Sequence, residues 1–199
     1  MLVNQIVNAL FQVILFAVLP LIWWLCTARR KETFWSWMGL RKIKTENKKQ
    51  FALLLAAACV GCFALGELAL LMRGDLQAAD SAYKGMGAAA IPSVLVYAFG
   101  QTALSEEMLF RGFLMKRLMA RFGFKAAAAV QAVLFGLIHI LMVWGQVGVV
   151  SGAVIVLYPM VVAVLLSYIN EKKAGGSILP SWVLHGVLNS LSGILQAML

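Results

Sequence analysis

The fold is decided by an uncharged stretch at residues 126–170, which reads AAAAVQAVLFGLIHILMVWGQVGVVSGAVIVLYPMVVAVLLSYIN. A helix needs about 20 apolar residues to cross the hydrocarbon core of a bilayer, so this stretch is long enough for two crossings. Backbone groups in lipid must find hydrogen-bond partners within the protein, and apolar runs of this length are typical of helices, not of barrel strands. We expect a helical hairpin that turns near residues 144–148.

More apolar stretches lie outside this hairpin. Three of them also lack Asp, Glu, Lys and Arg, and a fourth is interrupted only by Glu67; they cover residues 2–28, 85–105, 174–199 and 51–72. The chain has 199 residues, of which 62% are hydrophobic and 13% charged, too apolar a balance for a water-soluble domain of this size. No polar linker divides it. The sequence therefore predicts an all-α transmembrane bundle of about six spans, with residues 1–199 as a single domain.

The third span raises the question of where its helix ends. Pro92 suits a helix start, and the next strong helix breaker is Gly123. A helix over residues 92–122 would be about 45 Å long, and Glu106 would lie near its middle, within the membrane or at its inner boundary. We expect this long helix, with its last part as an amphipathic extension after the third span.

The net charge of +9 is explained by membrane topology and needs no nucleic acid as a partner. Eight of the 17 Lys and Arg residues lie between residues 29 and 49, and two smaller basic clusters lie at residues 111–125 and 172–173. Loops rich in Lys and Arg are typically cytoplasmic. We therefore expect a multi-pass protein of the cell membrane, in a bacterium the cytoplasmic membrane, with its N terminus outside.

Few ionisable side chains fall within the predicted spans, where they are costly and usually face the interior of a bundle or a wet cavity. Glu107 and Arg111 are spaced i and i+4 with the acid first, which favours a helical ion pair. Glu106 lies about 100° further around the helix and is free to face a cavity. The alternative is a cluster of charges that extend toward the cytoplasmic interface. Glu67 has no evident partner.

Both histidines of the chain also lie in apolar stretches. Phe135 precedes His139 by one helical turn, and His185 shares a helix face with Asn189. Gly186 would permit close helix approach. A carboxylate with an imidazole can activate water, and an imidazole with a carboxamide can stabilise an oxyanion. The alternative is that these groups only form hydrogen bonds between helices.

Three patterns occur in order, each on its own apolar segment: E-E-x-x-x-R at residues 106–111, F-x-x-x-H at 135–139 and H-x-x-x-N at 185–189. Together they resemble the CAAX-protease and bacteriocin-processing (CPBP/ABI) family of membrane proteins. The resemblance covers about residues 101–189. It implies a catalytic helical core over residues 88–199, preceded by variable spans over residues 1–87.

The resemblance also implies roles for the site residues. Glu106 would be the base that activates water, with help from His139, and His185 and Asn189 would form the oxyanion site. The supporting residues would be Glu107, Arg111 and Phe135. The family is regarded as metal-independent glutamate proteases, so neither a metal nor another cofactor is expected.

The expected function is that of an intramembrane endopeptidase that cleaves a membrane-associated peptide or protein, in bacteriocin processing or immunity. Its partners would be the lipid bilayer and this substrate. Three alternatives remain at this stage. A glutamate and the two histidines could bind zinc, with the second glutamate as base. The chain could be a non-catalytic immunity factor or scaffold. It could also be a transporter in which Glu106 and His139 relay protons.

Overall fold

The computed structural model describes residues 1–72 and 79–199, and within these ranges every regular element is a helix. This confirms the predicted all-α membrane bundle. The elements are α1 (Leu2–Thr27), α2 (Phe34–Met38), α3 (Lys48–Met72), η1 (Ala79–Tyr83), η2 (Gly87–Ala90), α4 (Ile91–Leu95), η3 (Val96–Leu104), η4 (Glu107–Met115), α5 (Lys116–Met142), α6 (Val149–Tyr168), η5 (Ile169–Lys173) and α7 (Leu179–Met198).

The elements from Gly87 to Met142 form one helical segment with a sharp bend at Gly123. The backbone of Gly123 has φ 75° and ψ 172°, a conformation that only glycine adopts readily. The helix predicted over residues 92–122 is therefore present, and it ends at the predicted breaker. The hairpin prediction also holds, because α5 ends at Met142 and α6 starts at Val149.

Four helices of the described residues are long and apolar enough to cross a membrane: Leu2–Thr27, Lys48–Met72, Gly87–Met142 and Val149–Lys173. The third of these includes the bend at Gly123 and so has two arms. Helix α7 is not among the four, because its polar side chains lower its mean hydropathy. The predicted count of about six requires both arms and α7 to cross, and it stays a prediction.

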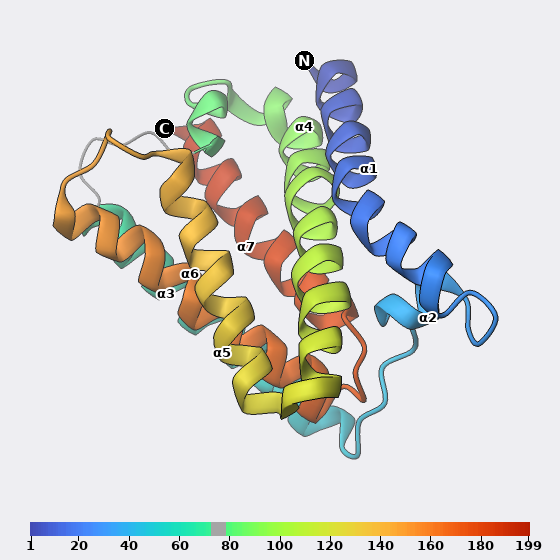
Figure 1. The fold of residues 1–199 in the computed structure, drawn as a ribbon. Coiled ribbons are helices and arrows are strands. Elements are labelled where there is room, and N and C mark those ends of the chain that lie inside the picture. The colour runs from blue at the N-terminus through green and yellow to red at the C-terminus, as the bar shows by residue number, and fades with distance from the viewer. Residues whose placement is uncertain (73–78) are drawn as a thin grey trace.

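Helix α7 lies in the interior of the bundle and carries one part of the candidate site (Figure 1). It packs against the helix formed by α4 and η3 on one side and against α3 on another. Helix α1 packs along η3, and α5 pairs with α6. Gly186 allows the close approach of α7 to η3, because a methyl group at this position would overlap the ring of Phe99. Both chain termini lie at the same end of the bundle (Figure 1).

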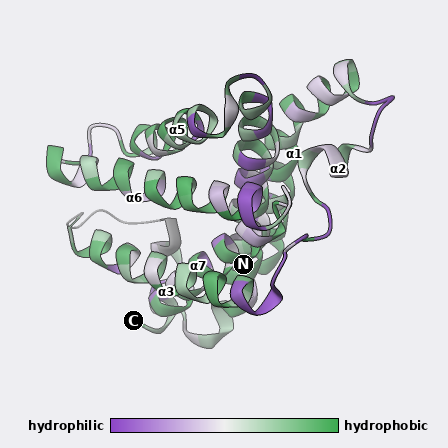
Figure 2. Ribbon diagram, turned by 90° about the horizontal axis from the view of Figure 1, so that it is seen from below, coloured by the Kyte–Doolittle hydropathy of each residue, from purple (hydrophilic) through white to green (hydrophobic). Residues whose placement is uncertain are grey.

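The basic segments meet at the other end. Arg41 Nη2 donates to the carbonyl of Gly175 at 3.0 Å, and Lys116 Nζ lies 2.7 Å from Glu171 Oε1. Figure 2 looks onto the bundle from below and shows hydrophilic residues mainly in the connecting segments, while α6 is largely hydrophobic. The three basic clusters thus share one end of the molecule, as the predicted topology requires. The side of the membrane on which this end lies stays a prediction.

The helix that carries Glu106 is wound more loosely than an α-helix. Segments η3 and η4 are π-helical, with hydrogen bonds from residue i to i+5, a geometry that is often found at functional sites. Three side chains bond to carbonyls of η3: Trp182 Nε1 donates to Phe99 O at 2.9 Å, Thr102 Oγ1 to Ala98 O at 3.0 Å, and Ser105 Oγ to Thr102 O at 3.1 Å. Sequence periodicity did not predict this winding.

Candidate active site

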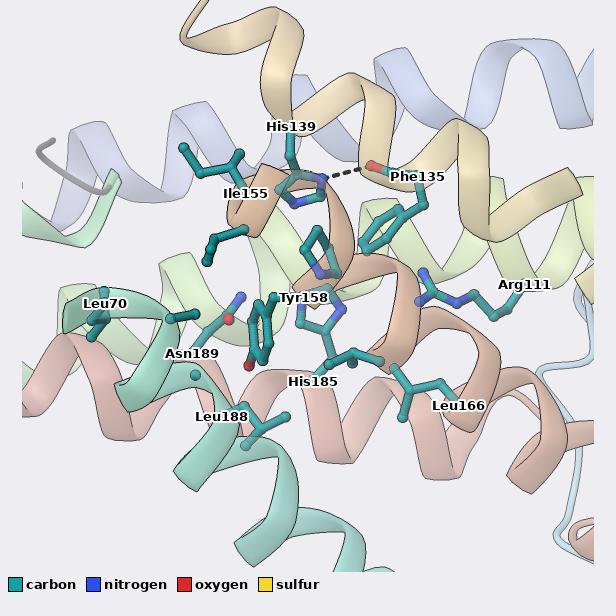
Figure 3. Close-up of a pocket in the computed structure, with 15 residues that line it drawn as sticks. Leu70, Arg111, Phe135, His139, Ile155, Tyr158, Leu166, His185, Leu188 and Asn189 are labelled. Atoms are coloured by element: carbon teal, nitrogen blue, oxygen red, sulfur yellow. Dashed lines mark hydrogen bonds between the residues drawn. The ribbon is translucent and has the colours of Figure 1, made fainter. Parts of the chain in front are cut away.

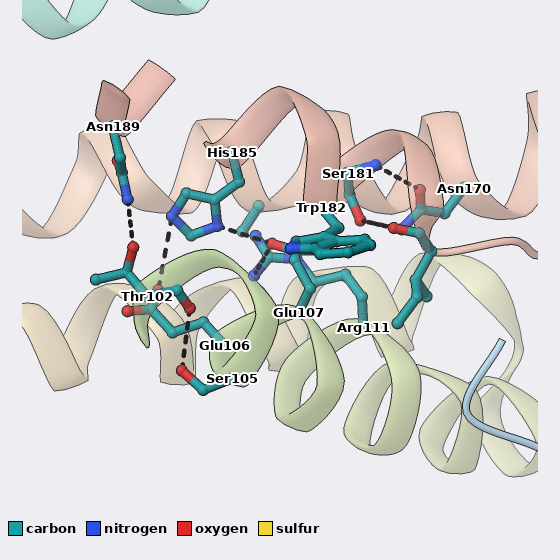
Figure 4. A network of polar contacts seen from close by, with 12 residues as sticks. Thr102, Ser105, Glu106, Glu107, Arg111, Asn170, Ser181, Trp182, His185 and Asn189 are labelled. Atoms are coloured by element: carbon teal, nitrogen blue, oxygen red, sulfur yellow. Dashed lines mark hydrogen bonds and ion pairs between the residues drawn. The ribbon is translucent and has the colours of Figure 1, made fainter. Parts of the chain in front are cut away.

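The residues that the three sequence patterns contribute lie on three neighbouring helices. Glu106, Glu107 and Arg111 come from the long helix, Phe135 and His139 from α5, and His185 and Asn189 from α7. Figure 4 shows the side chains of α7 pointing toward those of η3 and η4. Segments that are far apart in sequence therefore build one polar cluster inside an apolar bundle.

Glu107 is the centre of the buried part of this cluster. Its Oε1 lies 3.1 Å from Arg111 Nη1 and 3.1 Å from His185 Nδ1, and its side chain is 0% exposed. The guanidinium of Arg111 is also buried and lies over the ring of Phe135, 4.3 Å from the centroid. The approach of Arg111 to Glu107 does not have the angles of a hydrogen bond, so the attraction is coulombic. The pair expected from the i, i+4 spacing is present, and it also fixes an imidazole from α7.

Glu106 has a different environment from its neighbour. Its side chain is 19% exposed, and its Oε2 lies 3.8 Å from His185 Nε2, beyond hydrogen-bond distance. In an α-helix, adjacent residues point about 100° apart. Here both carboxylates reach the same imidazole, one at each ring nitrogen, so His185 lies between two acids.

His139 is oriented by its own helix. Its Nδ1 lies 2.7 Å from the carbonyl oxygen of Phe135, to which it donates, so in the neutral ring Nε2 is left as an acceptor. The ring also packs edge-on against Phe135, with 4.7 Å between the centroids. Among the described residues no hydrogen bond joins His139 to Glu106, although both line the same cavity. The imidazole closest to Glu106 is that of His185.

Asn189 is held by a residue that the sequence analysis did not single out. Its Nδ2 donates to Thr102 Oγ1 at 2.8 Å, and the Thr102 hydroxyl donates in turn to a backbone carbonyl. One N–H of the Asn189 amide remains for another acceptor. In the sequence, Thr102 could have been recognised as a hydroxyl side chain that lies in the uncharged stretch 85–105, four residues before Glu106.

Two cavities meet at this cluster. The first has a volume of about 540 Å³ and lies between α1 and α5, beside η3, and we call it the α1–α5 groove. Its lining residues are Asn8, Phe11, Gln12, Leu15, Phe16, Tyr97, Gln101, Thr102, Glu106, Phe110, Phe135, Ile138, His139, Met142, His185 and Asn189. The second, of about 240 Å³, is bounded by α3, α5, α6 and α7 and is mostly apolar (Figure 3). Four residues line both cavities: Phe135, His139, His185 and Asn189. Glu106 faces only the groove.

The zinc alternative gains no support from this arrangement. Within residues 1–72 and 79–199, no group of three or more His, Cys, Asp or Glu side chains is placed to hold a metal ion. The polar groups of the cluster are instead directed at one another and at the groove.

The fold and site thus define a polytopic helical membrane protein with a buried cluster of glutamate and histidine at the end of a groove. The chain belongs to the type II CAAX prenyl endopeptidase Rce1-like family, whose model matches residues 88–191. This confirms the resemblance seen in the sequence patterns. The matched region contains all the predicted site residues. Comparisons with curated proteins and with solved structures find no match.

Proposed function

We propose that the protein is an intramembrane endopeptidase that hydrolyses a peptide bond of a membrane-associated peptide or protein. The observation that carries this proposal is the position of His185 between Glu107 and Glu106, beside a groove of about 540 Å³. Cavities that bind small molecules have volumes of about 300–1,000 Å³. Membership of an endopeptidase family supports the same reaction.

In the proposed mechanism, Glu106 is the base. Its carboxylate takes a proton from water as the water oxygen attacks the carbonyl carbon of the substrate. Nε2 of His139, the acceptor left by the bond to Phe135, orients this water. The negative charge that develops on the carbonyl oxygen is stabilised by the free N–H of Asn189 and by Nε2–H of protonated His185. The C–N bond then breaks, and Glu106 returns the proton to the leaving nitrogen.

Glu107, Arg111 and Phe135 have positioning roles in this proposal. The Glu107 carboxylate accepts from Nδ1–H of His185 and so directs Nε2 toward the reaction centre. Arg111 balances the charge of Glu107, and Phe135 packs against both His139 and the guanidinium. The expected metal independence is part of this proposal, because the mechanism uses only protein groups.

The proposed location is the bacterial cytoplasmic membrane, with the N terminus outside and the basic end of the bundle in the cytoplasm. The gathering of the three basic clusters at one end supports this topology. A role in bacteriocin processing or immunity remains a proposal about the substrate.

The test is cleavage of a library of membrane-associated peptides by purified protein in detergent, with wild type and Glu106→Gln compared with and without a strong chelator. We expect wild type alone to cleave, and chelator to have no effect. Loss of cleavage with chelator and recovery with zinc would establish the zinc alternative. Equal cleavage by both proteins would contradict the role of Glu106, and biological activity retained by Glu106→Gln would favour a non-catalytic immunity or scaffold protein.

A further inference from the structure

The α1–α5 groove extends well beyond the site and has an amphipathic wall. The part of α1 that lines it runs from Asn8 to Phe16, and Gln12 between them donates to Ser105, the residue before Glu106. Asn8 precedes Gln12 by four residues of α-helix, about 6 Å, a length that matches about two residues of extended peptide. The groove therefore leads from Glu106 along the bundle toward the end that carries the N terminus.

The position of α1 beside this groove is fixed by a row of amide side chains. Gln5 Nε2 donates to Gln101 Oε1, Gln101 Nε2 donates to Gln12 Oε1 at 3.1 Å, and Gln12 Nε2 donates to Ser105 Oγ at 3.2 Å. Tyr83 extends the row by donating its hydroxyl to Gln5 Oε1 at 3.0 Å. Helix α1 is thus tied between Gln5 and Gln12 to the helix of Gln101 and Ser105, and its orientation about its own axis is set.

Asn8 lies between Gln5 and Gln12 in sequence but does not take part in this row. It is exposed, it lines the groove, and its side chain makes no hydrogen bond within residues 1–72 and 79–199. Asn8 precedes Gln12 by four residues, over which the helix turns by about 40° more than a full circle. Asn8 therefore lies beside the face that packs on η3, on the side of α5. The amide of Asn8 therefore keeps its N–H donors and its carbonyl acceptor for what enters the groove.

We infer that Asn8 is a substrate-positioning residue, whose amide pairs with the backbone of an extended peptide in the α1–α5 groove, about two residues from the bond that is cut. This inference rests on the proposed endopeptidase function and names its binding mode. A primary amide has both donors and an acceptor, so its oxygen can accept from a backbone N–H of the peptide, or its N–H can donate to a backbone C=O, as the groups of a neighbouring strand do. The apolar side chains Phe11 and Leu15, next to Asn8 on the wall, contact the side chains of the peptide. Recognition of this kind selects extended peptides through their backbone and tolerates varied sequences.

The test uses full-length protein in liposomes. The probe is the fluorescently labelled peptide that Glu106→Gln protein retains most strongly from the library of membrane peptides, so its choice does not depend on cleavage. The variants are Asn8→Leu and, as a matched control, Asn4→Leu. Asn4 is also an exposed amide of α1, about 6 Å further along the helix and not in the lining of the groove.

We expect Asn8→Leu to raise the Kd of the probe in the Glu106→Gln background about five- to tenfold, the effect of one hydrogen bond. In the wild-type background it should raise KM by the same factor and change kcat by less than about twofold, because it removes binding that ground and transition states share. Asn4→Leu should change neither. Methylation of the probe at one backbone nitrogen should raise the Kd by the same factor when Asn8 is present, and should not raise the Kd further in Asn8→Leu. Such non-additivity indicates that Asn8 and this backbone N–H bond to each other directly.

Four results would overturn the inference. The Kd of the probe could be unchanged in Asn8→Leu, or could rise equally in Asn4→Leu. The rises in Kd from Asn8→Leu and from methylation could multiply at every position of the probe, or no peptide could be retained at all. Retention that depends on Asn8 without cleavage by wild type would instead contradict the proposed reaction and leave the groove as a peptide site. The two proposals therefore fail separately.

Discussion

Nδ1 of His185 lies 3.1 Å from Oε1 of Glu107, so a buried carboxylate of the long helix fixes an imidazole that belongs to α7. The neighbouring carboxylate of Glu106 lies 3.8 Å from the other ring nitrogen. Two adjacent acids thus have separate tasks: one is enclosed and paired with Arg111, and the other is open to the groove. This division leads us to expect different effects on stability from the same substitution at the two positions.

Glu107→Gln should reduce both stability and activity. The substitution leaves the buried Arg111 charge without its partner, and breaking a buried ion pair from one side costs about 3–5 kcal/mol. A neutral amide also holds the Nδ1–H of protonated His185 less strongly than a carboxylate does, so kcat should fall by about 100-fold or more. Unfolding in detergent and cleavage rates of the same samples check this.

Glu106→Gln is the matched control for that experiment. This side chain is partly exposed and has no ion pair closer than 3.8 Å, so the loss of its charge should change stability by less than about 1 kcal/mol. Its cleavage should nevertheless be abolished. Equal destabilisation by the two substitutions would contradict the division of tasks.

Thr102→Val should lower activity through Asn189. Valine has nearly the shape of threonine but cannot accept from Asn189 Nδ2, which donates to the hydroxyl at 2.8 Å. An amide that loses its buried partner costs about 1–3 kcal/mol, and with the carboxamide no longer fixed we expect kcat to fall by about tenfold. Thr102→Ser keeps the hydroxyl and should keep most of the activity. Comparable activity of the valine and serine variants would show that Asn189 needs no support from Thr102.

Gly186→Ala should separate α7 from η3. The added methyl group would overlap the ring of Phe99, and overpacking of this kind costs about 1–3 kcal/mol. Gly61→Ala in α3 is the control, because nothing lies within 4 Å of a Cβ there. Alanine is the better helix former, so this variant should be as stable as wild type or slightly more stable. Thermal unfolding of both proteins in the same detergent measures the difference.

Gly123→Ala should test the bend in the long helix. No atom lies within 4 Å of a Cβ at this position, so any cost comes from forcing alanine to φ 75°, about 1–3 kcal/mol. Gly148 is a close control: its ψ of 170° is similar, its φ is −72°, and it also has free space around a Cβ. Gly148 is the N-cap of α6, where alanine is less favourable than glycine, so Gly148→Ala should cost about 0.5–1 kcal/mol, less than Gly123→Ala. A similar loss in both variants would mean that the bend does not depend on glycine.

Much of the architecture could be predicted from the sequence because its determinants are local. The uncharged stretches set the helices, Gly123 set the bend, and the i, i+4 spacing of Glu107 and Arg111 set their ion pair. The relations between helices could not be predicted in this way. That His185, and not His139, is the imidazole next to Glu106 depends on how α7 packs on η3, which no pattern within one helix specifies. The groove wall from α1 was missed for the same reason.

The π-helical winding of η3 limits how the length of this chain can change. Each wide turn holds a residue more than an ordinary turn would. Deletion of a single residue between Pro92 and Glu106 would therefore have an easy structural outcome, a return to regular α-helix, in which fold and membrane insertion survive. If the wide turns persist instead, a deletion within residues 103–105 rotates Thr102 and Gln101 by about 100° relative to Glu106 and detaches them from their partners on α7 and α1. A relative shortened in this way would insert and fold like this chain but would lack the proposed activity.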